Sequence, residues 1–203
     1  MIPALIDLHL RPTCTDAGVL DAELVTVQAR DRGLDGVVVL GRDETIRVGD
    51  TVAATAATGV QIFIGVELAT ERGLLLCYPR AEDDWFRGAG WRSVAKNDGA
   101  FSAEGVVRAF SERGGAVVAM PAVDQPPVAG VHGLLVASTT VDDAAVGVAQ
   151  QARLTCVGGS GSVVGDERFG SVATVFASPP TGQEALVEGL RSGRAWPVEI
   201  GTP

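Results

Sequence analysis

The sequence predicts a single α/β domain, residues 1–203, with a largely parallel sheet. Short apolar runs rich in Val, Leu and Ile alternate with segments of helical periodicity, which is the order typical of α/β proteins. A chain of 203 residues suits one domain and can bury a full core without disulfides or metals. With 46% hydrophobic and 20% charged residues, the composition is that of a globular protein.

Eight apolar runs are the candidate strands. Buried parallel strands are typically short, continuous runs of β-branched and aliphatic residues, and each of these runs fits that description. The runs span residues 4–8, 36–40, 61–67, 74–78, 116–120, 133–137, 154–157 and 172–176.

Five segments between the runs predict helices. Leu20, Leu24 and Val27 fall on one helical face, and Thr181 and Glu184 have the spacing of a capping box. The helices are expected over residues 21–32, 45–58, 102–113, 141–151 and 181–192.

Residues 79–100 break this rhythm. They show no clear period and hold two of the three tryptophans together with charges of both signs. We expect an irregular excursion whose aromatic side chains pack it onto the body of the domain. A lid over a site is the alternative, because long ordered loops sometimes serve that purpose.

Charge and cysteine usage narrow the class of protein. A formal charge of −9 and a pI of about 4.7 argue against general binding of nucleic acid, which needs a basic surface. Cys14, Cys77 and Cys156 are far apart and predict free thiols in a reducing compartment. Neither a signal peptide nor a membrane-spanning stretch is evident, so we expect a cytoplasmic protein that does not bind membranes.

Ionisable residues gather near the ends of three successive predicted strands. Asp7, His9 and Arg11 alternate with leucines, so a strand places them on one side. Because the carboxyl ends of parallel strands share one edge, the groups should lie together. The second and third strands contribute Arg42, Asp43 and Glu44, and Glu67.

These motifs resemble the PHP (polymerase and histidinol phosphatase) family. DLHLRPTCTDAG, residues 7–18, is similar to DLHxHTxxSDG, and GLDGVVVLGRDET, residues 33–45, is similar to GLDxxxxTDHDT. GVELATERGLLLCY, residues 65–78, resembles GIExST with its following strand, and GGAVVAMPA, residues 114–122, resembles GGxxxxAHP. Residues 130–136, 154–176 and 185–198 continue the likeness in order through GVHGLLV, the GGSDAH region and the closing helix.

The resemblance implies a distorted, TIM-like (β/α)7 barrel with a site at the carboxyl ends of its strands. In that family the site holds up to three metal ions and hydrolyses phosphoesters. Bound metals polarise phosphoryl oxygens and supply a hydroxide, and this requires a dense set of His, Asp and Glu ligands.

Most of that ligand set is replaced in this chain. His9, Asp16 and Glu67 match the family's motifs, whereas Arg11 stands in place of the second histidine of the first motif. The remaining replacements are Arg42, Asp43 and Glu44 for Asp, His and Asp, Leu74 and Met120 for histidines, and Gly161 and Val163 for the Asp and His of GGSDAH.

The substitutions leave three interpretations of the site. His9, Asp43 and Glu67 could hold one zinc or manganese ion, which is too few ligands for a multinuclear centre. Arg11 and Arg42, beside Asp7, could instead form a structural ion-pair network or a pocket for a small anion. We expect no cofactor, with the single metal as the alternative.

Three functions follow from these interpretations. The first is a PHP-like barrel without multinuclear catalysis, a binding or structural module for a small anion or a protein partner. The second is a phosphoesterase with a reduced, single-metal site. The third is a nucleotide-binding protein that uses the glycine loop of residues 158–165, although that loop lacks the P-loop lysine and the GxGxxG spacing.

Overall fold

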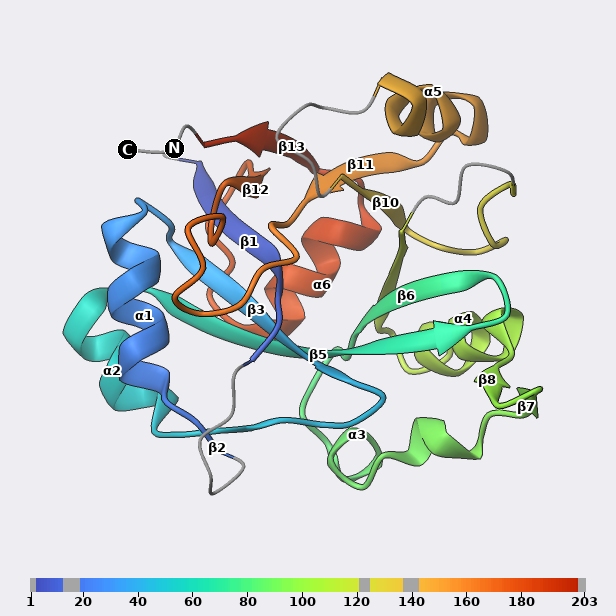
Figure 1. Ribbon diagram of the computed structural model, residues 1–203, viewed down its shortest axis with the longest axis horizontal. Coiled ribbons are helices and arrows are strands. Elements are labelled where there is room, and N and C mark those ends of the chain that lie inside the picture. Colours follow the sequence, from blue (N-terminus) through green and yellow to red (C-terminus); the bar gives the residue numbers. More distant parts are fainter. Residues whose placement is uncertain (1–2, 13–18, 121–124, 137–142, 201–203) are drawn as a thin grey trace.

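The computed structural model describes residues 3–12, 19–120, 125–136 and 143–200 (Figure 1). Asp16 and Cys14 lie outside these residues.

The main strands are β1 (Ala4–Leu10), β3 (Gly36–Arg42), β5 (Gln61–Thr70), β6 (Gly73–Tyr78), β9 (Ala116–Ala119), β10 (Gly133–Val136), β11 (Thr155–Gly158), β12 (Val172–Phe176) and β13 (Ala195–Glu199). Short strands are β2 (Val19–Leu20), β4 (Arg47–Val48), β7 (Lys96–Asn97) and β8 (Ala100–Phe101). Helices are α1 (Ala22–Asp31), α2 (Thr51–Thr58), α3 (Asp84–Arg87), η1 (Gly90–Ser93), α4 (Ala103–Ser111), α5 (Asp143–Ala152) and α6 (Gln183–Arg191).

Nine strands form one curved sheet in the order β11-β10-β9-β6-β5-β3-β1-β12-β13. In the described part of the chain, β6 and β12 run antiparallel to both neighbours, so the other seven point the same way. The ends of the sheet, β11 and β13, lie beside each other and nearly close a barrel. The predicted α/β barrel is therefore confirmed, with two reversed strands inserted in it.

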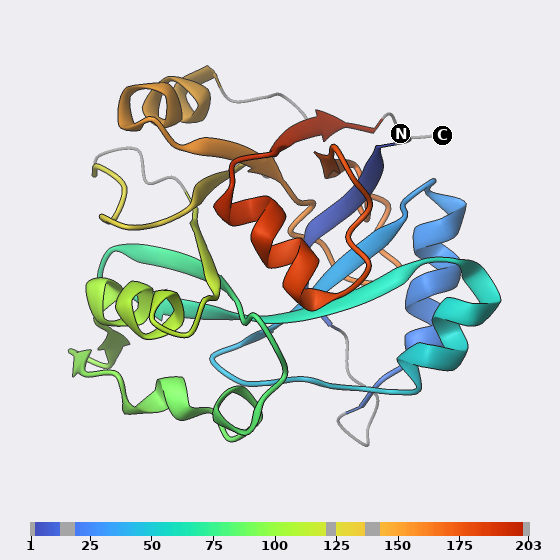
Figure 2. The same cartoon turned by 180° about the vertical axis from the view of Figure 1, so that it is seen from behind.

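Helices cover both faces of this sheet. Val37 and Val39 of β3 join the core cluster beneath α1, whereas Val38 and Leu40 join the cluster that contains α6. Because alternate residues of a strand face opposite ways, α1 and α6 lie on opposite faces. Figure 2 shows α6 lying across the strands on its own face.

Residues 79–100 contain short elements that pack against the body of the domain. The Trp91 ring is fully buried and contacts Phe101 edge-on, with 5.7 Å between the ring centroids. Trp85 contacts Phe110 of α4 in the same manner at 5.2 Å. The tryptophans thus hold this segment on the domain, as the sequence predicts.

Two local expectations are wrong, and one strand is missed. The helix expected at residues 45–58 begins only at Thr51, because Asp50 caps it and β4 occupies residues 47–48. The N-cap residue of α6 is Gly182, and no side chain forms a hydrogen bond with the first backbone amides of this helix. Thr181 and Glu184 therefore form no capping box. Strand β13 is not predicted at all, because it is half exposed and contains a proline.

The described helices include none that is both long and apolar enough to cross a membrane.

Candidate functional site

The carboxyl ends of β1, β3 and β5 place the candidate residues at one mouth of the barrel. These strands are adjacent and parallel, and Arg42 lies directly beside Glu67 in the register of β3 and β5. His9 belongs to β1, and Arg11 is the first residue after that strand. Strand order alone therefore gathers these four side chains, as the sequence predicts.

Glu67 is the centre of the cluster. His9 Nε2 lies 2.6 Å from Glu67 Oε2, and Arg11 Nε lies 3.4 Å from the same oxygen. Arg42 Nε lies 3.7 Å from Oε1. Burial raises the pKa of Glu67, but the hydrogen bond from His9 and the charges of His9, Arg11 and Arg42 outweigh it, so the pKa is lowered overall. The lowered pKa favours the ionised carboxylate of Glu67 at neutral pH.

The two arginines are exposed to different degrees. The Arg11 side chain is 39% exposed and that of Arg42 is 60% exposed, whereas Glu67 is 1% exposed. Among the described residues, Glu67 is the only ion-pair partner of either guanidinium. Two permanent cations therefore share one buried carboxylate, and both side chains are partly exposed.

Asp7 lies in a different set of contacts. It is fully buried, and its Oδ1 accepts hydrogen bonds from the backbone N of His9 at 3.0 Å and of Ser160 at 2.9 Å. The Ser160 hydroxyl donates to Asp7 Oδ2 at 2.6 Å. Burial raises the pKa of Asp7 although these hydrogen bonds oppose the shift. Asp7 holds the glycine loop in place and pairs with neither arginine.

The backbone amides of the glycine loop are all engaged from Gly158 to Ser162. They donate to Thr174 Oγ1, the Val136 carbonyl, Asp7 Oδ1, the His9 carbonyl and Ser160 Oγ, in chain order. A phosphate loop needs amides that point at the ligand, so this loop is no phosphate cradle. The nucleotide-binding hypothesis loses the feature on which it rested.

Asp43 has a strained backbone. Its φ is +53°, a left-handed conformation that side chains other than glycine seldom adopt. The backbone N of Ala69 donates to Asp43 Oδ1 at 3.1 Å, and Arg92 Nη2 donates to the Asp43 carbonyl at 3.2 Å. The sequence analysis does not single out Arg92. The one feature that could have drawn attention to it is its position directly after a tryptophan in residues 79–100.

The arrangement does not suit a metal ion. The described residues contain no group of three or more His, Cys, Asp or Glu side chains that could hold one. Asp43 binds a backbone amide, and the cationic Arg11 and Arg42 lie against Glu67, where they would repel a metal ion. The set His9, Asp43 and Glu67 is thus not assembled as a metal site.

Two buried atoms of the cluster have no hydrogen-bond partner within the part of the chain that the structure describes. They are His9 Nδ1 and Glu67 Oε1. A Cβ built on Gly161 would lie 3.5 Å from His9 Nδ1, so the backbone of this glycine packs closely against the fully buried imidazole.

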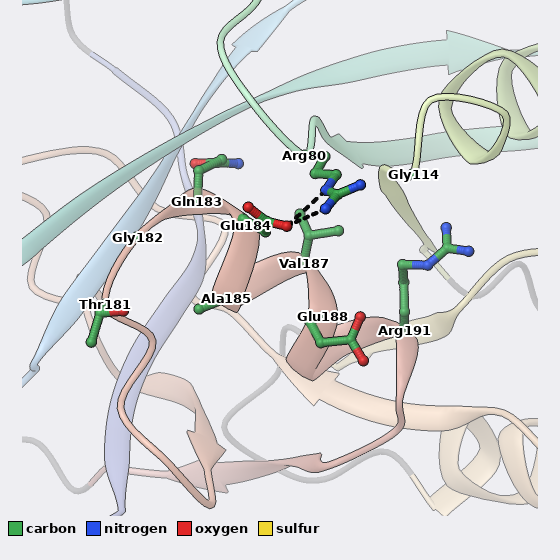
Figure 3. Close-up of a pocket in the computed structure, with 10 residues that line it drawn as sticks. All are labelled: Arg80, Gly114, Thr181, Gly182, Gln183, Glu184, Ala185, Val187, Glu188 and Arg191. Atoms are coloured by element: carbon green, nitrogen blue, oxygen red, sulfur yellow. Dashed lines mark hydrogen bonds and ion pairs between the residues drawn. The ribbon is translucent and has the colours of Figure 1, made fainter.

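A separate groove of about 730 Å³ lies at the opposite end of the strands (Figure 3). It is bordered by the start of α6, by Arg80 after β6 and by Gly114 before β9. Arg80 pairs with Glu184 across it, and Arg191 donates to the carbonyl of Gly115 at 2.7 Å. Arg80 and Glu184 therefore form an ion pair within this groove.

Comparison with known proteins gives similar structures only. No family profile and no curated protein sequence matches the chain. PsfC from Pseudomonas syringae PB-5123 superimposes with a TM-score of 0.65 at 18% identity, covering 98% of this chain and 92% of PsfC. A two-domain protein from Bacteroides vulgatus superimposes with a TM-score of 0.64 at 15% identity, covering 98% of this chain and 65% of that protein. It is described as containing a predicted PHP-like metal-dependent phosphoesterase.

The chain has the fold of PHP-like phosphoesterases. An amidohydrolase from Chromobacterium violaceum also shares this fold, with a TM-score of 0.58 at 16% identity over 97% of this chain and 98% of its own. At such identities the likeness concerns the fold, and the chemistry has to be argued from the residues of this PHP-like barrel.

Proposed function

We propose that this PHP-like barrel is a non-catalytic binding module that lacks multinuclear phosphoesterase chemistry and holds a small anion at its mouth. The observation that carries the proposal is the convergence of Arg11 and Arg42 on the single carboxylate of Glu67. Both arginines stand at sequence positions where the resemblance implies residues of the family's metal-binding motifs.

The exposure of the arginines favours binding over a purely structural network. A network that only neutralised Glu67 would need one cation, and here two guanidiniums with half-exposed side chains approach it. Their remaining N–H groups can form the paired hydrogen bonds that arginine makes with oxyanions. The description of the C. violaceum amidohydrolase includes bound sulfate and no metal, which supports the idea that this fold accepts an oxyanion without a metal.

The first experiment tests the absence of multinuclear catalysis. Purified protein is analysed for metals by mass spectrometry and assayed with phosphoesters in the presence of added manganese or zinc. We expect fewer than two metal ions per chain and no turnover above the buffer blank. The alternative, a phosphoesterase with one metal on His9, Asp43 and Glu67, predicts turnover that saturates with one ion per chain and is abolished by His9→Ala.

The second experiment tests anion binding. Chemical shifts of the arginine Nε–H groups are followed by NMR while phosphate, sulfate or acetate is added. We expect at least one anion to bind, and the double variant Arg11→Gln/Arg42→Gln to weaken its binding by about tenfold or more. Arg108→Gln, which removes an exposed arginine from α4, is the matched control and should change affinity less than twofold. Unchanged binding in the double variant would contradict the proposed site.

The proposal places the protein in the cytoplasm and assigns it no nucleic-acid or membrane partner. Cys77 and Cys156 are free thiols, and the formal charge is −9. A protein partner is the other kind of ligand that a non-catalytic barrel could recognise, and wild-type protein that binds no small anion would favour it.

A further inference from the structure

Residues 79–100 bring a third arginine to the mouth of the barrel. Arg92 belongs to η1, and both views of the fold show the loop after β3 beside the segment that carries α3 and η1 (Figures 1 and 2). Arg92 Nη2 donates to the carbonyl of Asp43, the residue that follows Arg42. An element packed on the outside of the barrel therefore reaches the strand ends where Arg42 lies.

Arg92 stands on a rigid base. The neighbouring Trp91 ring is fully buried in the core, and the Arg92 guanidinium carbon lies 5.3 Å from the centre of that ring. The hydrogen bond to Asp43 uses one of the five N–H donors of Arg92 and leaves the others for a ligand. The strained conformation of Asp43, with φ +53°, is held by this bond and by the Ala69 amide. Strain of this kind persists where surrounding contacts enforce it, typically at functional sites.

The fixed charges show why the third arginine matters. Arg11 and Arg42 carry two positive charges, and the carboxylates of Glu67, Asp43 and the exposed Glu44 carry three negative ones, so these five groups sum to one negative charge. Arg92 brings the sum to zero. The guanidinium supplied by residues 79–100 thus balances the carboxylates of the cluster.

We propose that Arg92 is an anion-binding residue of the mouth and that the ligand is a small molecule bearing a single carboxylate. This inference rests on the proposed function. On a cluster whose charges balance, a monoanion leaves one excess negative charge, whereas a phosphate monoester or sulfate dianion leaves two. A planar carboxylate also matches the planar donor edge of a guanidinium in a bidentate pair.

The test compares acetate with sulfate as probes for wild-type protein and four variants. Binding is followed by NMR titration of the arginine Nε–H resonances. We expect wild-type protein to bind acetate more tightly than sulfate, and Arg92→Gln to weaken acetate binding by about five- to tenfold. Arg92→Lys keeps the charge but loses the planar edge, so its affinity for acetate should lie between those of wild-type protein and Arg92→Gln.

The matched control is Arg87→Gln. Arg87 lies in the same segment, is exposed, and faces Glu82 at 3.7 Å and not the mouth. Its replacement should leave acetate binding within twofold of wild type. Thermal unfolding of each variant checks that the fold is retained, which the exposure of both arginines favours.

Each outcome bears on a different part of the argument. If Arg92→Gln binds acetate as wild type does while Arg11→Gln/Arg42→Gln does not, Arg92 has no role and the proposed function stands. If wild-type protein prefers sulfate, the single-carboxylate class is wrong. If it binds no anion, the proposed anion site itself fails.

Discussion

The Glu67 carboxylate illustrates how a buried charge is accommodated at the residue scale. It is 1% exposed and is surrounded by His9, Arg11 and Arg42 at 2.6 to 3.7 Å. Removing one partner of such a group leaves the others uncompensated, which is why buried pairs are costly to break. The carboxylate is therefore a structural requirement of the mouth as well as part of its electrostatics.

Glu67→Gln should lower the free energy of unfolding by about 1–3 kcal/mol at neutral pH, because an amide keeps one acceptor for His9 but loses the charge. Urea denaturation of both proteins measures the difference. The variant should also be less stable than Arg108→Gln, which removes a charge from an exposed helix face.

The pH dependence of that difference is a check on its cause. The pKa of Glu67 in the folded protein lies below its ordinary value of 4.5, so its ionised form stabilises the fold above 4.5. This contribution is lost as the pH falls through the lowered pKa. The raised pKa of Asp7 changes stability with pH in the opposite direction. Asp7 is present in both proteins, so its contribution cancels in the stability difference between wild type and Glu67→Gln. A stability difference that is constant from neutral to strongly acidic pH would contradict the electrostatic explanation.

At the scale of elements, the eight main strands β1 to β12 are predictable from the sequence. Their burial is nearly continuous, so composition alone marks them. β13 escapes prediction because Trp196 is 48% exposed and Pro197 interrupts the pattern. The direction of β6 is equally hidden, since a buried antiparallel strand reads like a parallel one.

The candidate site is predictable to the extent that neighbouring strands build it. His9, Arg42 and Glu67 come together because β1, β3 and β5 are adjacent. The bond between Asp7 and Ser160 joins residues 153 positions apart, and that between Arg92 and Asp43 joins residues 49 apart. No local pattern encodes such contacts, because they depend on how loops fold back on the barrel.

The caps of α4 and α6 give a prediction for single elements. Ser102 caps α4 by accepting a hydrogen bond from the Gly105 amide at 3.2 Å, whereas Thr181 caps nothing. Ser102→Ala should therefore lower the free energy of unfolding by about 1 kcal/mol, and Thr181→Ala by less than about 0.5 kcal/mol. Chemical denaturation of both variants measures this, and equal losses would show that Thr181 does form a cap.

At the scale of the whole molecule, a side chain joins β11 to β12 where the sheet closes into a barrel. In the described part of the chain no backbone ladder joins β11 to β12 or β13. Thr174 of β12 bridges this seam, because its hydroxyl accepts from the Gly158 amide at 2.7 Å and donates to the Gly158 carbonyl at 2.8 Å. The threonine is fully buried, so water cannot replace these bonds.

Thr174→Val keeps the shape of the side chain but removes both bonds, and should lower the free energy of unfolding by about 1–3 kcal/mol. Hydrogen exchange should show faster opening of β11 and β13 than of β3. Thr26→Val is the control: Thr26 is equally buried, but its hydroxyl donates to the Ala22 carbonyl within α1, an interaction that adds little to helix stability. If the two variants lose the same stability, the seam is not closed by Thr174.

The glycine loop at the mouth has a consequence for how such a protein can change. Its course is set by contacts of its own backbone with β1, β10 and β12, by Asp7 and by the left-handed conformation of Gly161, and none of these contacts uses the side chain of Val163. Shape and chemistry are therefore encoded by separate residues here. A barrel built in this way can exchange one set of reactive groups for another while its frame stays intact, which makes the mouth a natural starting point for designing new binding specificities.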